Sequence, residues 1–297
     1  MVELAEKDIR IVALSAAMID GTGLEKFAAR FPGRSFDVGI AESHAVTFAA
    51  GLARAGFRPV AAIYSTFLQR GYDMMIHDIC LQNLPVIFCL DRAGLVGEDG
   101  PTHHGAFDVA YLRHIPNMTV MAPATPEELA AMLELAVKIE GPVAIRYPKG
   151  VGLYTGSVPC GPLESGKAEL LRSGKDIAII SIGSMAGVAL KTAEALGARK
   201  INAAVVNARF VKPMDLNTIS QICRDTKRIV TIEDGTLEGG FGSAVLEAVC
   251  GMGIKGIQVR RFGLPDRFIE HGKREELFIK YNLTPDAICD VIVREMF

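Results

Sequence analysis

Residues 91–105 form a glycine-rich loop dense in side chains that bind anions or move protons. They read Asp-Arg-Ala-Gly-Leu-Val-Gly-Glu-Asp-Gly-Pro-Thr-His-His-Gly and follow the apolar run Pro85–Leu90, which is typical of a buried parallel strand. Ligands of open α/β sheets bind beyond the carboxyl ends of the strands. A guanidinium suits phosphate, and imidazoles and carboxylates suit proton transfer. We therefore expect a ligand site rather than a plain polar surface loop, with candidate residues Arg92, Glu98, Asp99, His103 and His104.

A carboxylate opens the apolar helix expected over Ala41–Ala55. Glu42 comes directly after the run Phe36–Ile40 and stands in the first turn of that helix. One interpretation is that it only complements the positive end of the helix dipole. The other is that a strand end aims it into the crevice at the edge of the sheet. The residues alone leave both interpretations open.

The next apolar run closes with Tyr64-Ser-Thr-Phe-Leu-Gln-Arg70. Taken singly, Phe67 would be a core aromatic residue and Arg70 a solvated helix residue. Glu42, Phe67 and Arg92, however, each follow an expected strand, and we take the three strands to be neighbours. Because ligand sites form where parallel strands end, we expect these three side chains to gather at one edge of a sheet.

Short apolar runs alternate with helical patterns along the chain, which is typical of parallel sheets covered by helices. The expected strands are Ile9–Leu14, Val60–Tyr64, Pro85–Leu90, Thr119–Ala122, Pro142–Arg146, Ile177–Ile182, Ala203–Asn207, Ile229–Glu233 and Ile257–Arg261. The expected helices are Ala41–Ala55, Thr66–Gln82, Pro126–Ile139, Met185–Ala198, Asp215–Arg224, Gly242–Val249 and Pro285–Phe297. The pattern predicts an α/β fold of two tandem three-layer domains with mostly parallel sheets. We place the domains at residues 1–150 and 167–297, joined by a glycine- and proline-rich linker over residues 151–166.

Composition limits the class of protein. The 297 residues are 49% apolar and 22% charged, with a net charge of −2, so we expect neither a disordered chain nor a nucleic-acid binder. No uncharged apolar stretch approaches about 18 residues, so we expect no membrane span. Six cysteines without a CxxC pair favour reduced thiols and a cytoplasmic protein. GxGxxG and HExxH are missing and the histidines lack metal-ligand spacing, so we expect no metal ligands in this chain.

These motifs together resemble the C-terminal two-thirds of the 1-deoxy-D-xylulose-5-phosphate synthases, a family of the transketolase superfamily. The resemblance covers nearly the whole chain, and the run Ile63–Arg70 is quite specific to the synthases. The segments that carry it are Asp37–Leu52, Ala62–Arg70, Asp91–Asp108, Ile145–Gly150, Asn207–Pro213, Glu233–Gly240 and Gly263–Gly272. It implies a pyrimidine-binding domain, then a transketolase C-terminal domain, with thiamine diphosphate as cofactor. The implied enzyme is a transferase of isoprenoid biosynthesis that joins pyruvate to glyceraldehyde 3-phosphate with loss of CO2.

The resemblance also implies roles for single residues. The residue matching Glu42 hydrogen-bonds a ring nitrogen of the cofactor's aminopyrimidine and favours the tautomer that removes the thiazolium C2 proton. Such a bond needs a dry pocket, which the apolar helix after Glu42 would supply. Phe67 would stack on the pyrimidine, with Tyr64 beside it. The substrate channel would be lined by Tyr64, Arg70, Asp99 and His103, the last two as catalytic groups that handle protons and hydroxyls.

Two cations would meet the substrate phosphate. Arg92 would grip the phosphate of glyceraldehyde 3-phosphate as a fork. The family has a second arginine in an Arg-Tyr-Pro-Arg pattern, and this sequence has Lys149 there. A lysine binds phosphate as a point charge. The substitution therefore bears on the affinity for the acceptor or on its identity.

The family holds the diphosphate and Mg²⁺ through a Gly-Asp-Gly…Asn motif in an N-terminal domain, whereas this sequence contains no Gly-Asp-Gly. The catalytic histidines of that domain are missing as well. The resemblance therefore implies half an active site. We expect either a subunit that pairs with a separate N-terminal diphosphate-binding chain or a fragment of a longer enzyme, assembled as a homodimer or heterotetramer.

Two alternatives stay open. The first is the C-terminal subunit of a split transketolase, although Tyr64–Arg70 and Gly105–Asp108 favour the synthase. A β subunit of a 2-oxoacid dehydrogenase shares the two domains but lacks the Arg-Ala-Gly…Thr-His-His loop. The second alternative is a non-catalytic association module with a relic site. The joint presence of the candidate residues argues against it: Glu42, Phe67, Arg92, Asp99 and His103.

Overall fold

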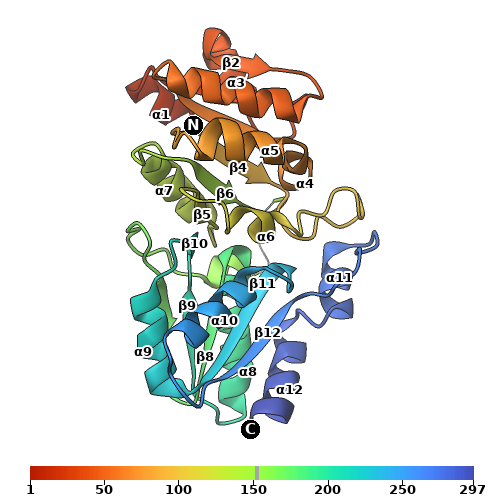
Figure 1. Cartoon of the computed structure of the whole chain (residues 1–297). Coiled ribbons are helices and arrows are strands. Elements are labelled where there is room, and N and C mark those ends of the chain that lie inside the picture. Colours follow the sequence, from red (N-terminus) through yellow and green to blue (C-terminus); the bar gives the residue numbers. More distant parts are fainter. Residues whose placement is uncertain (151–153) are drawn as a thin grey trace.

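A seven-stranded sheet forms the first half of the molecule in the computed structural model, which describes residues 1–150 and 154–297 (Figure 1). Its strand order is β10-β5-β6-β4-β3-β1-β2, and every strand is parallel except the edge strand β10. The strands are β1 (Ile11–Ser15), β2 (Ser35–Asp37), β3 (Arg58–Tyr64), β4 (Ile87–Asp91), β5 (Thr119–Met121), β6 (Val143–Arg146) and β10 (Phe210–Lys212). β1, β3, β4 and β6 are buried along their whole length, as their apolar runs predict.

Helices cover both faces of this sheet. One face packs on α3 and the broken helix after β3 through Ala45, Ala49 and Met75. The other face packs on α1, α2 and α7 through residues such as Phe27 and Met132. The helical segments are α1 (Val2–Lys7), α2 (Glu25–Arg30), η1 (Pro32–Arg34), α3 (Glu42–Arg54), α4 (Ser65–Leu68), η2 (Gln69–Gly71), α5 (Tyr72–Met74), η3 (Met75–Cys80), α6 (Asp108–Leu112) and α7 (Pro126–Ala136).

The single helix expected over Thr66–Gln82 is wrong. The segment changes from α-helix to a 3₁₀ turn and ends as the π-helix η3. Gly71 passes so close to α3 that a Cβ there would lie 2.7 Å from Val46 Cγ2. The carbonyl of Arg70 accepts a hydrogen bond from the Ser43 hydroxyl, 2.7 Å away, instead of from the helix alone. Close packing on α3 therefore overrides the helical pattern.

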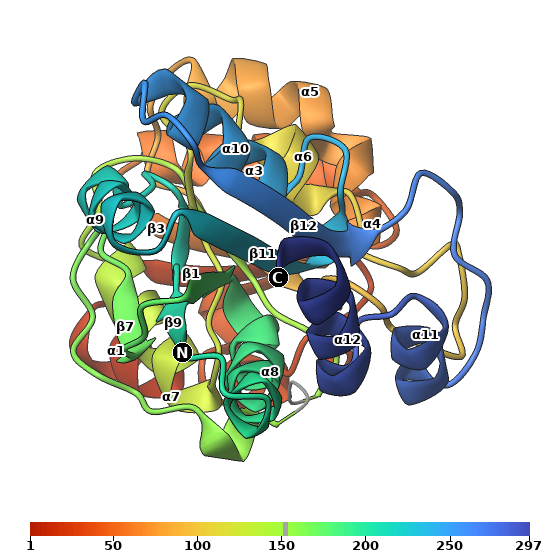
Figure 2. The same ribbon diagram turned by 90° about the horizontal axis from the view of Figure 1, so that it is seen from below.

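The second half contains a five-stranded sheet in the order β12-β11-β8-β9-β7. All its strands are parallel except the edge strand β7, which no apolar run marked. The strands are β7 (Glu169–Arg172), β8 (Ile177–Ser181), β9 (Ala203–Asn207), β11 (Arg228–Thr236) and β12 (Gln258–Leu264). The helical segments are η4 (Thr155–Ser157), η5 (Gly183–Met185), α8 (Ala186–Ala198), α9 (Leu216–Thr226), α10 (Phe241–Gly251), α11 (Arg274–Lys280) and α12 (Pro285–Met296). In Figure 2, α9 and α10 lie on one side of this sheet and α8 and α12 on the other.

The two halves are interlocked. β10 leaves the second half and adds to the first sheet, where Phe210 pairs with Met121 of β5. One hydrophobic cluster also runs from Val120 and Ala122 into Ile180 and Val206 of the second sheet. The halves are thus two sheets with a shared core. Residues 151–153 of the expected linker lie outside the described part of the chain. Within the described ranges, no helix combines the length and apolarity that a bilayer crossing needs.

Candidate active site

The predicted site residues gather at the carboxyl edge of the first sheet. β3 and β4 are neighbours in register, Tyr64 beside Asp91, so Phe67 and Arg92 follow adjacent strand ends. β2, which precedes Glu42, is separated from β3 by β1, so the expectation of three neighbouring strands was wrong. The three side chains still share one edge, because β1 to β4 are all parallel.

Glu42 is the first residue of α3 and only 3% exposed. Its Oε1 accepts a hydrogen bond from Arg70 Nη1 at 3.0 Å, and the Arg70 side chain is 59% exposed at the rim. The Arg70 guanidinium also lies 5.3 Å from the centre of the Phe67 ring. An accessible cation therefore engages a buried carboxylate and lies close to an aromatic ring.

Three aromatic rings pack together at this edge of the sheet. Tyr64 and Phe67 stack with 5.5 Å between ring centres and 12° between planes. The His103 ring meets Phe67 edge-on, 5.3 Å away at 71°. His103 Nδ1 lies 2.9 Å from Thr102 Oγ1. Burial raises the pKa of Tyr64, with the nearby charge of Arg92 acting against it. The tyrosine is therefore a neutral hydroxyl at physiological pH.

Arg92 is fixed by groups that the sequence analysis missed. Its Nη1 donates to the Gly21 carbonyl at 2.7 Å and lies 3.1 Å from Asp91 Oδ2. Its guanidinium lies 3.8 Å from the centre of the Tyr64 ring. Gly21 belongs to the turn sequence Asp-Gly-Thr-Gly at residues 20–23, after the expected strand Ile9–Leu14. That strand ends at the same edge of the sheet as the other site strands. Its position after a strand end could therefore have marked Gly21 as part of the site.

Lys149 and Asp99 form an ion pair across the mouth of the site. Lys149 Nζ donates to Asp99 Oδ2 at 3.1 Å, and both side chains are exposed. The hydrogen bond from Lys149 lowers the pKa of Asp99, and the nearby charges of His103 and Arg92 act in the same direction. Each of the two cations expected to share a phosphate thus has its own carboxylate partner, Asp91 for Arg92 and Asp99 for Lys149.

His104 and Glu98 differ from the other loop residues. Glu98 is exposed. His104 is 4% exposed and its ring nitrogens contact the backbone: Nδ1 accepts from Val96 N at 3.1 Å, and Nε2 donates to the Glu270 carbonyl at 3.1 Å. The expectation that His104 is a ligand-binding side chain is therefore wrong. Only distant packing, invisible in the local sequence, separates it from His103.

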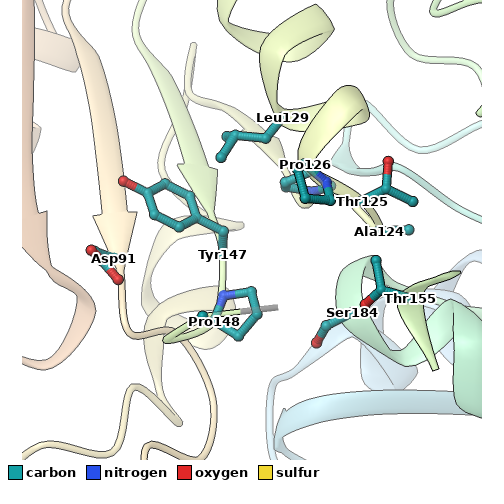
Figure 3. A pocket seen from close by; sticks show the side chains of 11 residues that line it. Asp91, Ala124, Thr125, Pro126, Leu129, Tyr147, Pro148, Thr155 and Ser184 are labelled. Carbon is teal, nitrogen blue, oxygen red and sulfur yellow. The ribbon is translucent and has the colours of Figure 1, made fainter. Parts of the chain in front are cut away.

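A cavity of about 260 Å³ lies beside Asp91, between the two halves. Figure 3 shows Asp91 and Tyr147, from strand ends of the first sheet, on one side of it, with Thr125, Pro126 and Ser184 on the other. Burial raises the pKa of Asp91, and Arg92 opposes that shift. Burial also raises the pKa of Tyr147 far above its usual range. The sequence analysis did not single out this cavity or its lining residues.

Two family models together account for most of the chain. Residues 1–152 match the transketolase pyrimidine binding domain, and residues 166–288 match the transketolase C-terminal domain. The chain belongs to the transketolase family. This membership confirms the resemblance and the expected α/β fold with two mostly parallel sheets.

Among curated proteins, this transketolase-family chain is similar to enzymes of one name. The 1-deoxy-D-xylulose-5-phosphate synthase 1 of Geobacter metallireducens is 55% identical over 288 residues, 96% of this chain and 46% of the relative. The 1-deoxy-D-xylulose-5-phosphate synthase of Desulforudis audaxviator is 55% identical over 97% of this chain and 46% of the relative. The chain thus spans about half the length of the curated relatives it matches.

Among solved structures, a split gene transketolase, described as an inactive beta4 tetramer, superposes with a TM-score of 0.87. It is 34% identical to this transketolase-family chain, and the match covers 99% of this chain and 94% of that one. The transketolase of Campylobacter jejuni has a TM-score of 0.80 at 19% identity, which shows the shared fold alone. The roles assigned above to single residues stay predictions.

Proposed function

We propose that this chain is the pyrimidine-binding and C-terminal part of a thiamine-diphosphate-dependent 1-deoxy-D-xylulose-5-phosphate synthase. One observation carries the proposal. Arg70 links the buried carboxylate of Glu42 to the Phe67 ring, in a chain 55% identical to enzymes of that name. The reaction would join pyruvate and glyceraldehyde 3-phosphate with release of CO2. We expect the cytoplasm as its location.

The residues fit the pyrimidine half of the cofactor. Phe67 offers an aromatic face, and a flat heteroaromatic ring stacks favourably on such a face. Glu42, nearly excluded from water, would hydrogen-bond a ring nitrogen of the pyrimidine. Arg70 would then release the Glu42 oxygen that it now engages. When bound, thiamine diphosphate supplies the nucleophilic carbon that takes up the donor.

The cations of the site would receive the substrate anions. Arg92 is oriented by Gly21 and by the Tyr64 ring, so its fork needs little reordering to meet the acceptor phosphate. Lys149 would exchange Asp99 for the same phosphate. Asp99, freed from Lys149, and His103 would then orient the acceptor hydroxyl and carbonyl and move the proton between them.

The diphosphate and Mg²⁺ would bind to a second chain or domain that carries the Gly-Asp-Gly…Asn motif. This sequence has no such motif. Among the described residues, no cluster of three His, Cys, Asp or Glu side chains is arranged to hold a metal ion. The assembly would be a dimer of complete active sites or a heterotetramer. The tetramer described for the split gene transketolase supports an oligomer.

The test is to combine the chain with a diphosphate-binding partner, thiamine diphosphate and Mg²⁺. With pyruvate and glyceraldehyde 3-phosphate, we expect deoxyxylulose 5-phosphate and one CO2 per turnover. Glu42→Ala should lower the turnover rate by several orders of magnitude, while the complex still forms. Glu238→Ala is the matched control. It removes an exposed loop carboxylate outside the site and should leave the turnover rate unchanged. A complex that binds the cofactor but never consumes pyruvate would refute the synthase.

A split transketolase is the second candidate. The split gene transketolase matches this chain over 94% of its own length, so a free-standing chain of this composition has a precedent. The two functions differ in their donor. A transketolase takes a two-carbon unit from a ketose phosphate and releases an aldose phosphate without CO2. Turnover with a ketose phosphate, but not with pyruvate, would favour this candidate.

A further inference from the structure

The loop over residues 93–105 has a buried stem and an exposed tip. Backbone hydrogen bonds of 2.8 Å run in both directions between Gly94 and Gly105 and close its base. Residues 93–97 are buried, whereas Glu98 and Asp99 are exposed. Asp99 and His103 both stand in the tip. Whatever fixes the stem therefore also decides where these two side chains lie.

Asp234 of β11 holds one side of the stem. It is 1% exposed, and its Oδ1 accepts a hydrogen bond from Leu95 N at 3.0 Å. Its Oδ2 lies 3.2 Å from Arg274 Nη2, and its carbonyl accepts from Arg146 Nη2 at 2.9 Å. Gly94, at φ +73°, runs so close that a Cβ there would overlap the Asp234 carboxylate. The carboxylate is thus tied to both halves of the molecule.

His104 holds the other side. Val96 N donates to Nδ1, so Nδ1 carries a lone pair and the proton lies on Nε2. Nε2 donates to the carbonyl of Glu270, which precedes α11 in the second half. A neutral imidazole therefore bridges two backbone segments that are far apart in the sequence. Such a bridge is specific, because either lost bond leaves a buried polar group without its partner.

The segment before α11 also contacts the loop. Gly272 N donates to the Gly97 carbonyl at 3.3 Å. A Cβ on Gly97 would lie 3.2 Å from the Gly272 carbonyl, and a Cβ on Gly100 would lie 3.1 Å from His271 Cβ. Both loop glycines also have positive φ angles. The glycines of the loop thus allow close contact with the second half, rather than leaving the loop loose.

We propose that Asp234 and His104 are positioning residues, through which the second half of the chain fixes the loop and so places Asp99 and His103 for the reaction. The inference rests on the proposed function, because it takes these two side chains to meet the substrate. An exposed tip on a fixed stem needs little reordering when substrate binds. A small displacement of groups at a reacting centre costs a large factor in rate.

Three variants and a control test this. His104→Phe keeps the ring volume and removes both hydrogen bonds. His104→Asn keeps an acceptor close to the position of Nδ1 and should restore the bond from Val96. Asp234→Ala removes the other anchor. Asp215→Ala is the control: this buried carboxylate of the same half caps α9 through Thr218 N at 3.2 Å, away from the loop.

Hydrogen exchange of the full chain reports on the stem directly. We expect His104→Phe and Asp234→Ala to speed exchange of the amides of Leu95 and Val96 by about tenfold or more, as local opening becomes easier. His104→Asn should return the Val96 amide to near its original rate, and Asp215→Ala should change neither amide. Unchanged exchange in His104→Phe and Asp234→Ala would overturn the proposal.

Kinetics of the complex with the diphosphate-binding chain report on positioning. We expect kcat to fall about tenfold to a hundredfold in His104→Phe, with both KM values within about twofold, and to recover only in part in His104→Asn, which lacks the bond to Glu270. A loosened stem with unchanged kcat would overturn the proposal as well. Absence of turnover in the original complex would instead refute the proposed function, and the exchange rates would still decide whether Asp234 and His104 hold the loop.

Discussion

Gly21 offers a test of how Arg92 is placed. A Cβ on Gly21 would overlap the Tyr64 hydroxyl and lie 3.0 Å from Met18 Cε. Gly21 has no positive φ, so alanine strains the side-chain packing and not the backbone. Overpacking costs about 1–3 kcal/mol. Alanine also makes the unfolded chain less flexible than glycine does, which stabilises the folded state by about 0.4–1 kcal/mol. We therefore expect Gly21→Ala to lower the free energy of unfolding by about 1–2 kcal/mol.

The same substitution should weaken phosphate binding. Tyr64 must shift, and the Arg92 guanidinium lies over its ring and on the Gly21 carbonyl. Loss of a charge-assisted hydrogen bond costs about 1.5–3 kcal/mol, or about ten- to a hundredfold in KM. In the two-chain complex we expect this rise for glyceraldehyde 3-phosphate, with the KM for pyruvate nearly unchanged. Glyceraldehyde without phosphate should be affected much less.

Gly33→Ala is the matched control. No atom lies within 4 Å of a Cβ at Gly33, and its φ is not positive. It should raise the free energy of unfolding by about 0.4–1 kcal/mol in urea titrations and leave both KM values unchanged. If Gly21→Ala behaves like Gly33→Ala in both assays, then Gly21 does not orient Arg92 and the assignment of the phosphate site fails.

Three further predictions concern the cofactor, an ion pair and the core. The chain alone should bind thiamine diphosphate poorly by calorimetry, because the diphosphate and its metal supply much of the attraction; micromolar affinity would contradict this. Lys149→Ala should raise the pKa of Asp99 in carboxyl NMR titrations and raise the acceptor KM about tenfold; equal losses for phosphorylated and unphosphorylated acceptors would show that the phosphate lies elsewhere. Glu128→Ala should destabilise the fold in urea by about 1.5–3 kcal/mol, because the buried guanidinium of Arg209 loses its 2.6 Å bond to Glu128 and keeps Glu169 as its carboxylate partner; a loss under about 0.5 kcal/mol would contradict the ion-pair argument.

Strand burial decides which parts of the fold the sequence predicts. β3, β4 and β8 are apolar on both faces and were expected within two residues of their bounds. β7 is a partly exposed edge strand and β10 has three residues, so neither has an apolar run long enough to mark it. β2, also a partly exposed edge strand, was marked only by the short run Phe36–Ile40. Helix starts with side-chain caps are equally legible. Thr125, ahead of Pro126, accepts a hydrogen bond from Glu128 N at 3.1 Å, as expected of an N-cap.

The sequence predicted which side chains share one edge of the sheet, but not which of them contact one another. Parallel strands bring Glu42, Phe67 and Arg92 to one edge whatever their neighbours are. The hydrogen bonds and ion pairs of these side chains depend on segments that are far apart in the sequence. The ion pair of Lys149 with Asp99 and the burial of His104 under Glu270 leave no local pattern. The family resemblance implied roles for Lys149, Asp99 and His103, and the structure shows that His104, its neighbour in sequence, is buried against the backbone instead.

The antiparallel strand β10 bears on the order in which the molecule is made. The edge of β5 has no partner until residues 210–212 exist, since Phe210 and Lys212 are its neighbours in the sheet. During synthesis, the outer edge of β5 therefore stays unpaired while about sixty further residues leave the ribosome after Gly150. An unpaired edge invites other chains. We expect a version truncated near residue 150 to aggregate in the cell, and a nascent chain to become protease-resistant only once Lys212 has emerged.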